Sequence, residues 1–169
     1  CRSAAASEPW RAAPRRPWVE PLPEHLDRST LERPSRPGAL VIGLADRPAE
    51  QRRTTVEVDL ERRGGVLIVG APRSGRSGAL RTIAAASVSD PRAPTVVHGI
   101  DDGRSLDGIE RIVGAGGTVE VPVGADDAEA TLRLLRSLSR RCRVGGTGKE
   151  DPGSHDRVVL LVDGIGAFV

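Results

Sequence analysis

The stretch GGVLIVGAPRSGRSGALRTIAAASV, residues 64–88, decides the fold. It opens with a short apolar run, Val66 to Val69, which predicts a buried β-strand. A loop punctuated by glycine follows, from Gly70 to Gly75, and apolar residues then recur at helical spacing: Leu80, Ile83 and Ala84. We therefore expect a strand, a tight loop and a helix in direct succession.

The loop and the start of the helix, residues 70–77, fit the Walker A pattern G-x-x-x-x-G-K-S/T except that Arg76 replaces the lysine. In this pattern the loop N–H groups curl around phosphates, and the following helix directs its positive end at them. Arg76 keeps the charge, but its forked guanidinium is larger than an ammonium group. We expect ATP binding to survive this change better than catalysis does. The predicted nucleotide-binding residues are Gly70, Ala71, Pro72, Arg73, Ser74, Gly75, Arg76, Ser77 and Gly78.

A second candidate motif lies at residues 158–163, VVLLVD. An apolar strand that ends in an acid has the form of a Walker B strand, so we expect Asp163 to hold Mg²⁺ through water and Ser77 to ligate the same ion. A glutamate that activates the attacking water usually comes next, but Gly164 stands there and cannot act as a base. An ordinary buried strand that ends in a surface aspartate is the alternative, and the upstream loop favours the paired motif.

The rest of the chain alternates between strand and helix patterns. We expect an α/β fold with a mostly parallel sheet, because such alternation implies crossover connections. The expected strands are 39–46, 54–60, 95–100, 117–123 and part of 157–168; the expected helices are 105–113 and 126–142, and 145–156 is a loop. Residues 1–38, rich in proline and arginine, predict a leader or interdomain linker, and 39–169 predict a partial ATPase domain that is incomplete at its C-terminus.

Composition narrows the function classes. A net charge of +2 with mixed signs gives no basic stripe of the kind that a dedicated nucleic-acid binder carries. The two cysteines form neither a disulfide framework nor a metal-ligand set. No apolar run reaches the roughly 20 residues that span a bilayer, so we expect a soluble fragment without membrane contact of its own.

These segments together resemble the FtsK/SpoIIIE type of P-loop ATPase domain. The likeness covers about residues 17–169, and the leader PWVEPLPEHL is similar to linkers in actinobacterial multi-ATPase proteins such as the EccC component of type VII secretion systems. The resemblance implies a RecA-like core that partners neighbouring ATPase domains in a ring or stacked array. It also implies movement of double-stranded DNA or secreted protein, on the cytoplasmic side of the plasma membrane. The sequence departs from the family pattern at Arg76, Gly78 and Gly164.

Two functional hypotheses follow. One is a motor that binds and slowly hydrolyses Mg·ATP and moves DNA or protein. The other is a domain that binds nucleotide with little or no hydrolysis and supports an active neighbour, and the absence of a glutamate at position 164 favours it. The arginines of the helix predicted at 126–142 are interpreted as solvated charges rather than as a DNA-binding surface.

Overall fold

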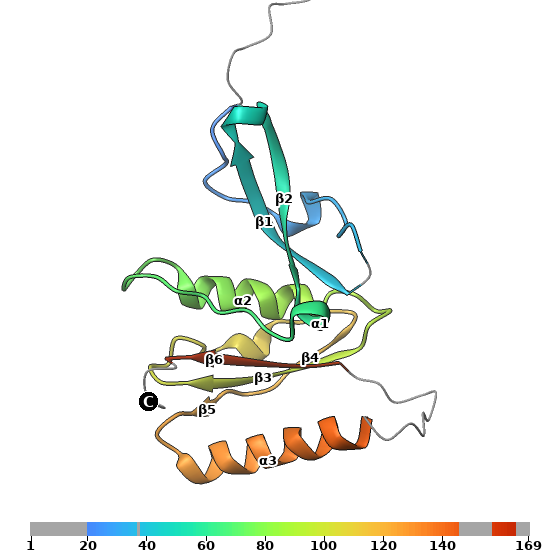
Figure 1. Ribbon diagram of the computed structural model, residues 1–169. Helices are drawn as coiled ribbons and strands as arrows, with labels where there is room; N and C mark the ends of the chain where they lie inside the picture. Colours follow the sequence, from blue (N-terminus) through green and yellow to red (C-terminus); the bar gives the residue numbers. More distant parts are fainter. Residues whose placement is uncertain (1–19, 37, 146–156, 165–169) are drawn as a thin grey trace, which may run out of the picture.

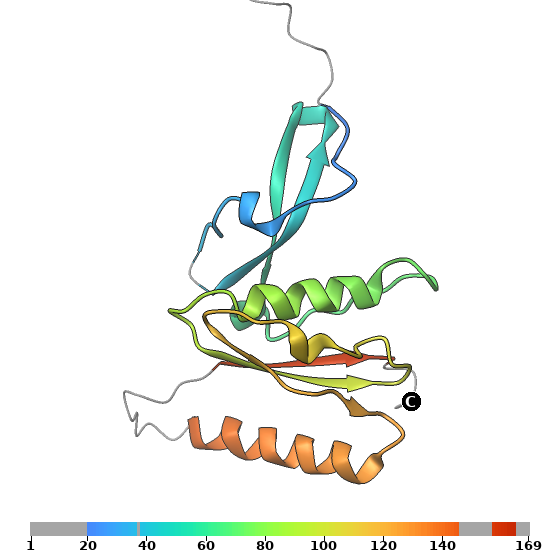
Figure 2. The ribbon, with the colours of Figure 1, turned by 180° about the vertical axis from the view of Figure 1, so that it is seen from behind.

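The computed structural model describes residues 20–36, 38–145 and 157–164. Its elements form layers: a projecting hairpin, a helix, a parallel sheet and a second helix on the far side of the sheet (Figures 1 and 2). The strands are β1 (Ala39–Arg47), β2 (Arg52–Asp59), β3 (Thr95–Asp101), β4 (Gly117–Val119), β5 (Val123–Gly124) and β6 (Arg157–Asp163). The helices are α1 (Leu60–Arg63), α2 (Arg76–Ser87) and α3 (Ala128–Gly145), with 3-10 turns η1 (Arg28–Thr30), η2 (Pro48–Glu50) and η3 (Ile109–Arg111).

The parallel sheet is centred on β3. β6 pairs with β3 along its whole length, from Thr95↔Arg157 to Asp101↔Asp163. β4 and β5 pair in parallel with the beginning and the end of β3, so the two short strands follow one another along its other edge. The expected α/β class with a parallel sheet is confirmed by these pairings. Each parallel connection crosses over through a helix or a long loop, as parallel pairing requires.

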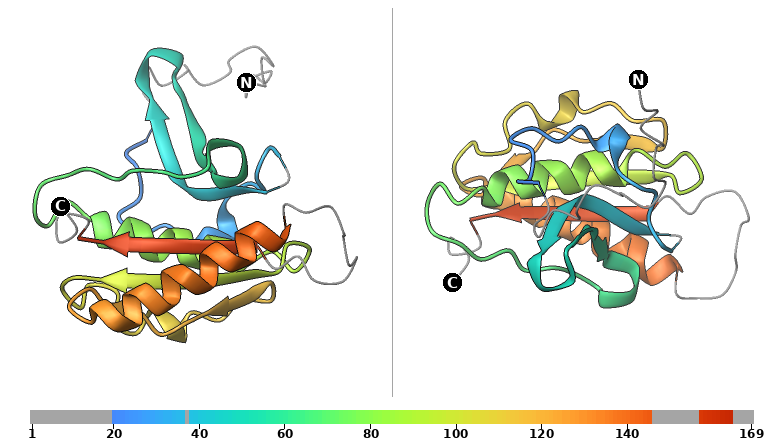
Figure 3. Two further views of the ribbon diagram at one scale, coloured as in Figure 1. Left: turned by 60° about the horizontal axis from the view of Figure 1, so that its bottom comes forward. Right: turned by 90° about the horizontal axis from the view of Figure 1, so that it is seen from above.

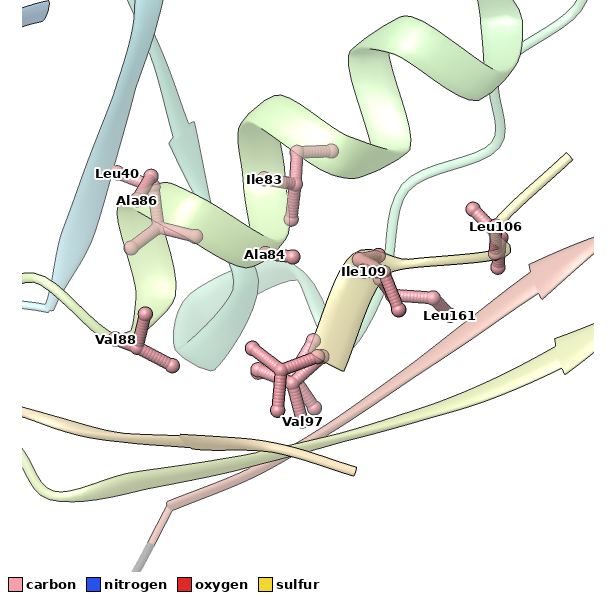
Figure 4. Close-up of a cluster of buried hydrophobic side chains, with 11 residues drawn as sticks. Leu40, Ile83, Ala84, Ala86, Val88, Val97, Leu106, Ile109 and Leu161 are labelled. Atoms are coloured by element: carbon pink, nitrogen blue, oxygen red, sulfur yellow. The ribbon is translucent and has the colours of Figure 1, made fainter. Parts of the chain in front are cut away.

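The core lies between α2 and the sheet. Ile83 and Ala84 of α2 face Val97 of β3 and Leu161 of β6, and the segment after β3 adds Leu106 (Figure 4). α2 is therefore buried along one stripe, as the spacing of its apolar residues predicts. On the opposite face of the sheet α3 crosses the strands, with Thr131 buried and Leu134 half-buried (Figure 3).

The hairpin β1–β2 is antiparallel and forms a sheet of its own. Its base is buried against α2 through Leu40, whereas its tip projects away from the core. The preceding residues run along it, and the Ser35 backbone N–H and hydroxyl donate hydrogen bonds of 2.7 and 2.6 Å to the Glu57 carboxylate. These hydrogen bonds lower the pKa of Glu57.

The expected strand from Val66 to Val69 is wrong. Residues 65–71 carry no strand pairing, and the side chains of Val66, Leu67 and Val69 are 46%, 73% and 84% exposed. The run is apolar enough for a buried strand, but a strand also needs a hydrogen-bonding neighbour. In the described residues β6 pairs only with β3, so this segment has no ladder to join.

Two further predicted elements, one helix and one strand, differ in length from those in the structure. The helix predicted over 105–113 is only the turn η3, because Gly108 adopts a left-handed φ of 79° that interrupts it. The strand predicted over 117–123 is divided into β4 and β5; Pro122 lies in the break, and proline has no N–H to donate to a ladder. The predicted loop 145–156 lies almost wholly outside the described residues. No helix within the described ranges is long and apolar enough to cross a membrane.

Candidate functional site

The candidate site lies where the loop 70–75 enters α2. The chain turns sharply there: the Ser74 N–H donates to the Ala71 carbonyl at 3.1 Å, and Arg73 and Gly75 have left-handed φ values of 63° and 90°. Gly75 is the N-cap of α2 and provides no side-chain cap. The first N–H groups of the 12-residue helix therefore face the loop without a side-chain acceptor, which is the arrangement that attracts an anion.

One hydrogen bond joins the two halves of the predicted site. The Ser77 hydroxyl, in the first turn of α2, donates to Oδ2 of Asp163 at 2.5 Å, although the residues are 86 positions apart. Ser77 is carried by the helix that follows the loop, and Asp163 is the last residue of β6. Both side chains are half-buried. A hydroxyl and a carboxylate oxygen side by side at the end of a parallel sheet are ligands suited to Mg²⁺.

Two neighbouring aspartates at the end of β3 were not singled out from the sequence. Asp101 is opposite Asp163 in the register but buried, and its carboxylate accepts hydrogen bonds from the N–H groups of Gly103 at 3.1 Å and Leu106 at 2.7 Å. Its role is therefore to hold the loop after β3. Asp102 is exposed. The sequence did contain a signal for these aspartates: the strand pattern that ends at Asp101 resembles the strand that ends at Asp163.

Gly164 occupies a restricted position. Its φ is 81°, in the left-handed region, and a Cβ placed on it would lie 2.5 Å from the Cβ of Asp102. A side chain at position 164 thus meets both an unfavourable backbone angle and a neighbouring side chain. In this conformation glycine fits and glutamate does not.

The other loop residues lie at the surface. Ala71, Pro72, Arg73, Ser74 and Arg76 are exposed, as is Gly78. Ser74 folds over the start of the loop, where its Oγ lies 2.3 Å from the position that a Cβ on Gly70 would take, so glycine is required at 70 for this close approach. A Cβ on Gly78 would meet nothing within 4 Å, so the absence of threonine there has no steric cause.

These residues fit a magnesium-bound phosphate. Uncapped helical N–H groups and the exposed guanidinium of Arg76 supply positive potential, and Ser77 and Asp163 supply two oxygens for the ion. Mg²⁺ keeps several waters and substrate phosphate oxygens as its remaining ligands. The described residues contain no group of three or more His, Cys, Asp or Glu side chains placed to hold a metal ion.

Comparison with known proteins shows sequence similarity to parts of larger proteins. The chain is similar to EccC proteins of ESX secretion systems. It is 42% identical over 71 residues, 39% of this chain, to the ESX-4 secretion system protein EccC4 of Mycobacterium tuberculosis. It is 29% identical over 175 residues, 90% of this chain, to the ESX-1 secretion system protein EccCb1 of Mycolicibacterium smegmatis. No protein-family model and no solved structure matches.

The matched relatives are much longer than this chain. The alignments cover 6% of EccC4 and 29% of EccCb1. The predicted likeness to EccC proteins is confirmed at this coarse level, while the FtsK/SpoIIIE assignment stays a prediction. Both relatives are named for secretion, so the comparisons give the DNA-moving alternative no support.

Proposed function

We propose that the chain is a nucleotide-binding domain of a secretion-type translocase, with a RecA-like core that binds Mg·ATP and hydrolyses it weakly or not at all. The observation that carries the proposal is the 2.5 Å hydrogen bond between Ser77 and Asp163, because it joins two motifs that the sequence separates widely. The similarity to ESX secretion proteins supports the translocase context. The partners proposed from the family resemblance are neighbouring ATPase domains and a secreted protein, on the cytoplasmic side of the plasma membrane.

Each residue of the site has a proposed role. The N–H groups of residues 70–78 would surround the phosphates, Arg76 would neutralise their terminal charge, and Ser77 and Asp163 would hold Mg²⁺. Bound Mg·ATP supplies the phosphoanhydride whose hydrolysis drives translocation in active motors. No glutamate follows Asp163 in the sequence, since Gly164 has no side chain and no room for one. ATP binding without rapid hydrolysis is therefore the favoured hypothesis, and a motor that hydrolyses ATP at this site is the alternative.

A direct titration tests the proposal. We expect a fluorescent ATP analogue to bind saturably, and much more tightly with Mg²⁺ than without it, to the full-length protein in which every other P-loop is disabled. Phosphate release by the same sample should stay near that of a sample without protein. Release well above that background would establish the motor alternative. Absence of Mg²⁺-dependent binding would remove the nucleotide role of this domain.

Adding the missing glutamate should not create an ATPase. Gly164→Glu is expected to leave phosphate release unchanged and to lower the melting temperature, because a side chain with positive φ costs roughly 1–2 kcal/mol and collides with Asp102. Gly164→Ala is the matched control, with the same backbone strain and no carboxylate, and it should lower the melting temperature to a similar extent. A clear gain of phosphate release in Gly164→Glu alone would show that the backbone at 164 rearranges and that the weak site lacks only a base.

A further inference from the structure

A pocket lined by arginines lies at the base of the hairpin β1–β2. Its volume is about 440 Å³. Arg36 comes from the segment that precedes β1, and Arg62 and Arg63 come from α1. Ala39, the buried first residue of β1, also lines it. In Figure 1 α1 lies below the hairpin and beside the end of α2, whereas the loop 70–75 leads into the start of that helix. The pocket is therefore separate from the candidate nucleotide site.

The three guanidiniums of this pocket have no partner within the described residues: none of those residues accepts a hydrogen bond from them or pairs with them. Other arginines nearby are engaged. Arg157 pairs with Glu61 at 3.2 Å. Arg53 donates to backbone carbonyls of the segment that precedes the hairpin. All three pocket arginines are exposed, so their N–H groups are available to a ligand.

The two acidic side chains of the pocket already have donors of their own. The Glu57 carboxylate accepts the two hydrogen bonds from Ser35 at 2.7 and 2.6 Å. These bonds, with a smaller contribution from Arg36, hold the pKa of Glu57 below its ordinary value, so it stays ionised. Asp59 caps α1 by accepting a hydrogen bond from the Arg62 N–H at 2.9 Å. Three arginines against two carboxylates leave the lining with one net positive charge.

We propose that this pocket binds an acidic peptide segment of a partner protein. The planar fork of a guanidinium matches a carboxylate and donates two parallel hydrogen bonds to it. A pocket of this volume accommodates a few residues of an extended chain rather than a folded domain. The acidic side chains of such a segment lie beside the three arginines.

The carboxylates of the pocket favour a peptide over a small anion. A phosphate dianion in the pocket meets the negative charges of Glu57 and Asp59 at short range. A peptide also carries backbone N–H groups, and each of these two carboxylates keeps acceptor sites beyond the hydrogen bonds it already receives. An acidic segment thus satisfies both signs of charge in the lining: its carboxylates face the arginines and its N–H groups face the acids.

A titration of the full-length protein tests the proposal. The probe is a fluorescent peptide of alternating glutamate and glycine, and its neutral counterpart has glutamine in place of glutamate. We expect the glutamate peptide to bind, and to bind less tightly as NaCl is added, because contacts with exposed arginines are screened by salt. The double variant Arg62→Gln/Arg63→Gln should bind it at least about tenfold more weakly, since two charge-assisted contacts are lost. Equal binding of the two peptides would overturn the proposal.

Arg133→Gln/Arg136→Gln is the matched control. These arginines are exposed on α3 and do not line the pocket, and the double variant has the same net charge as the first. Its affinity for the glutamate peptide should stay within about twofold of the wild type. Equal loss in both double variants would show attraction by net charge alone and would contradict a specific pocket.

Photo-crosslinking locates the peptide without any substitution in the protein. A benzophenone group at the centre of the glutamate peptide should label residues 35–36 or 57–63, and labelling confined to other segments would refute the proposal. Inorganic phosphate should compete no better than NaCl of equal ionic strength; stronger competition by phosphate would identify a site for small anions instead. Both experiments are performed without nucleotide, so their outcomes are independent of the proposed ATP binding.

Discussion

Replacing Asp163 by alanine is expected to weaken Mg²⁺-dependent nucleotide binding about 10- to 100-fold. The substitution removes the carboxylate that accepts the Ser77 hydrogen bond and would hold the ion, and hydrogen bonds to charged groups contribute about 1.5–3 kcal/mol each. The measurement is a titration of the fluorescent ATP analogue with Mg²⁺ and again with EDTA. In EDTA the wild type and the variant should bind equally weakly, because the lost group acts through the metal.

Asp102→Ala is the matched control for this prediction. Asp102 is an exposed carboxylate at the end of the neighbouring strand β3, and its backbone N–H, which donates to the Asp163 carbonyl at 3.3 Å, remains in the variant. Binding by Asp102→Ala should stay within about twofold of the wild type. Equal loss in both variants would indicate a general effect of negative charge at this edge of the sheet and would contradict a specific role for Asp163.

Gly117→Ala is expected to destabilise the fold by about 3 kcal/mol, the upper part of the range for overpacked sites. Gly117 is paired with Thr95, and a Cβ on it would lie 1.9 Å from the Thr95 carbonyl oxygen. Backbone cannot move aside as a flexible side chain can, so the pairing of β3 with β4 must open. For a chain of this size the loss corresponds to a fall in melting temperature of about 6–12 °C, measured by circular dichroism.

Gly43→Ala provides the control for the glycine substitution. Gly43 also lies in a strand, β1, but a Cβ there meets nothing within 4 Å and its φ is not left-handed. Its effect on the free energy of unfolding should stay within about 0.5 kcal/mol. If Gly117→Ala and Gly43→Ala have the same melting temperature, the close approach of β4 to β3 does not limit stability, and the prediction for Gly117 is wrong.

Local patterns predicted much of this molecule. The helix α2 was expected because its apolar residues recur at helical spacing, and β3 and β6 because their short apolar runs lie between turn residues. The association of Ser77 with Asp163 was also expected, because the Walker A and Walker B patterns assign both residues to one Mg²⁺ ion. Each of these inferences needs only the local sequence and the direction of the strands.

The incorrect or missed features concern backbone conformation and the hydrogen-bond partners of backbone groups. The run 66–69 has the composition of a strand but no neighbouring ladder, and the role of Asp101 follows from the two N–H groups that its carboxylate accepts. The turn at 108 shortened a predicted helix, although its glycine was visible in the sequence. Composition alone does not reveal which backbone groups find partners.

The sequence by itself determined the α/β class with a parallel sheet and the two candidate motifs, because hydrophobic period and glycine spacing act over a few residues. The tertiary structure alone decided two other features: the fit of Ser77 to Asp163 at hydrogen-bonding distance and the lack of space for a side chain at Gly164. Each arises where segments far apart in the chain approach within van der Waals distance, and that approach is set by packing of the whole sheet rather than by any local pattern.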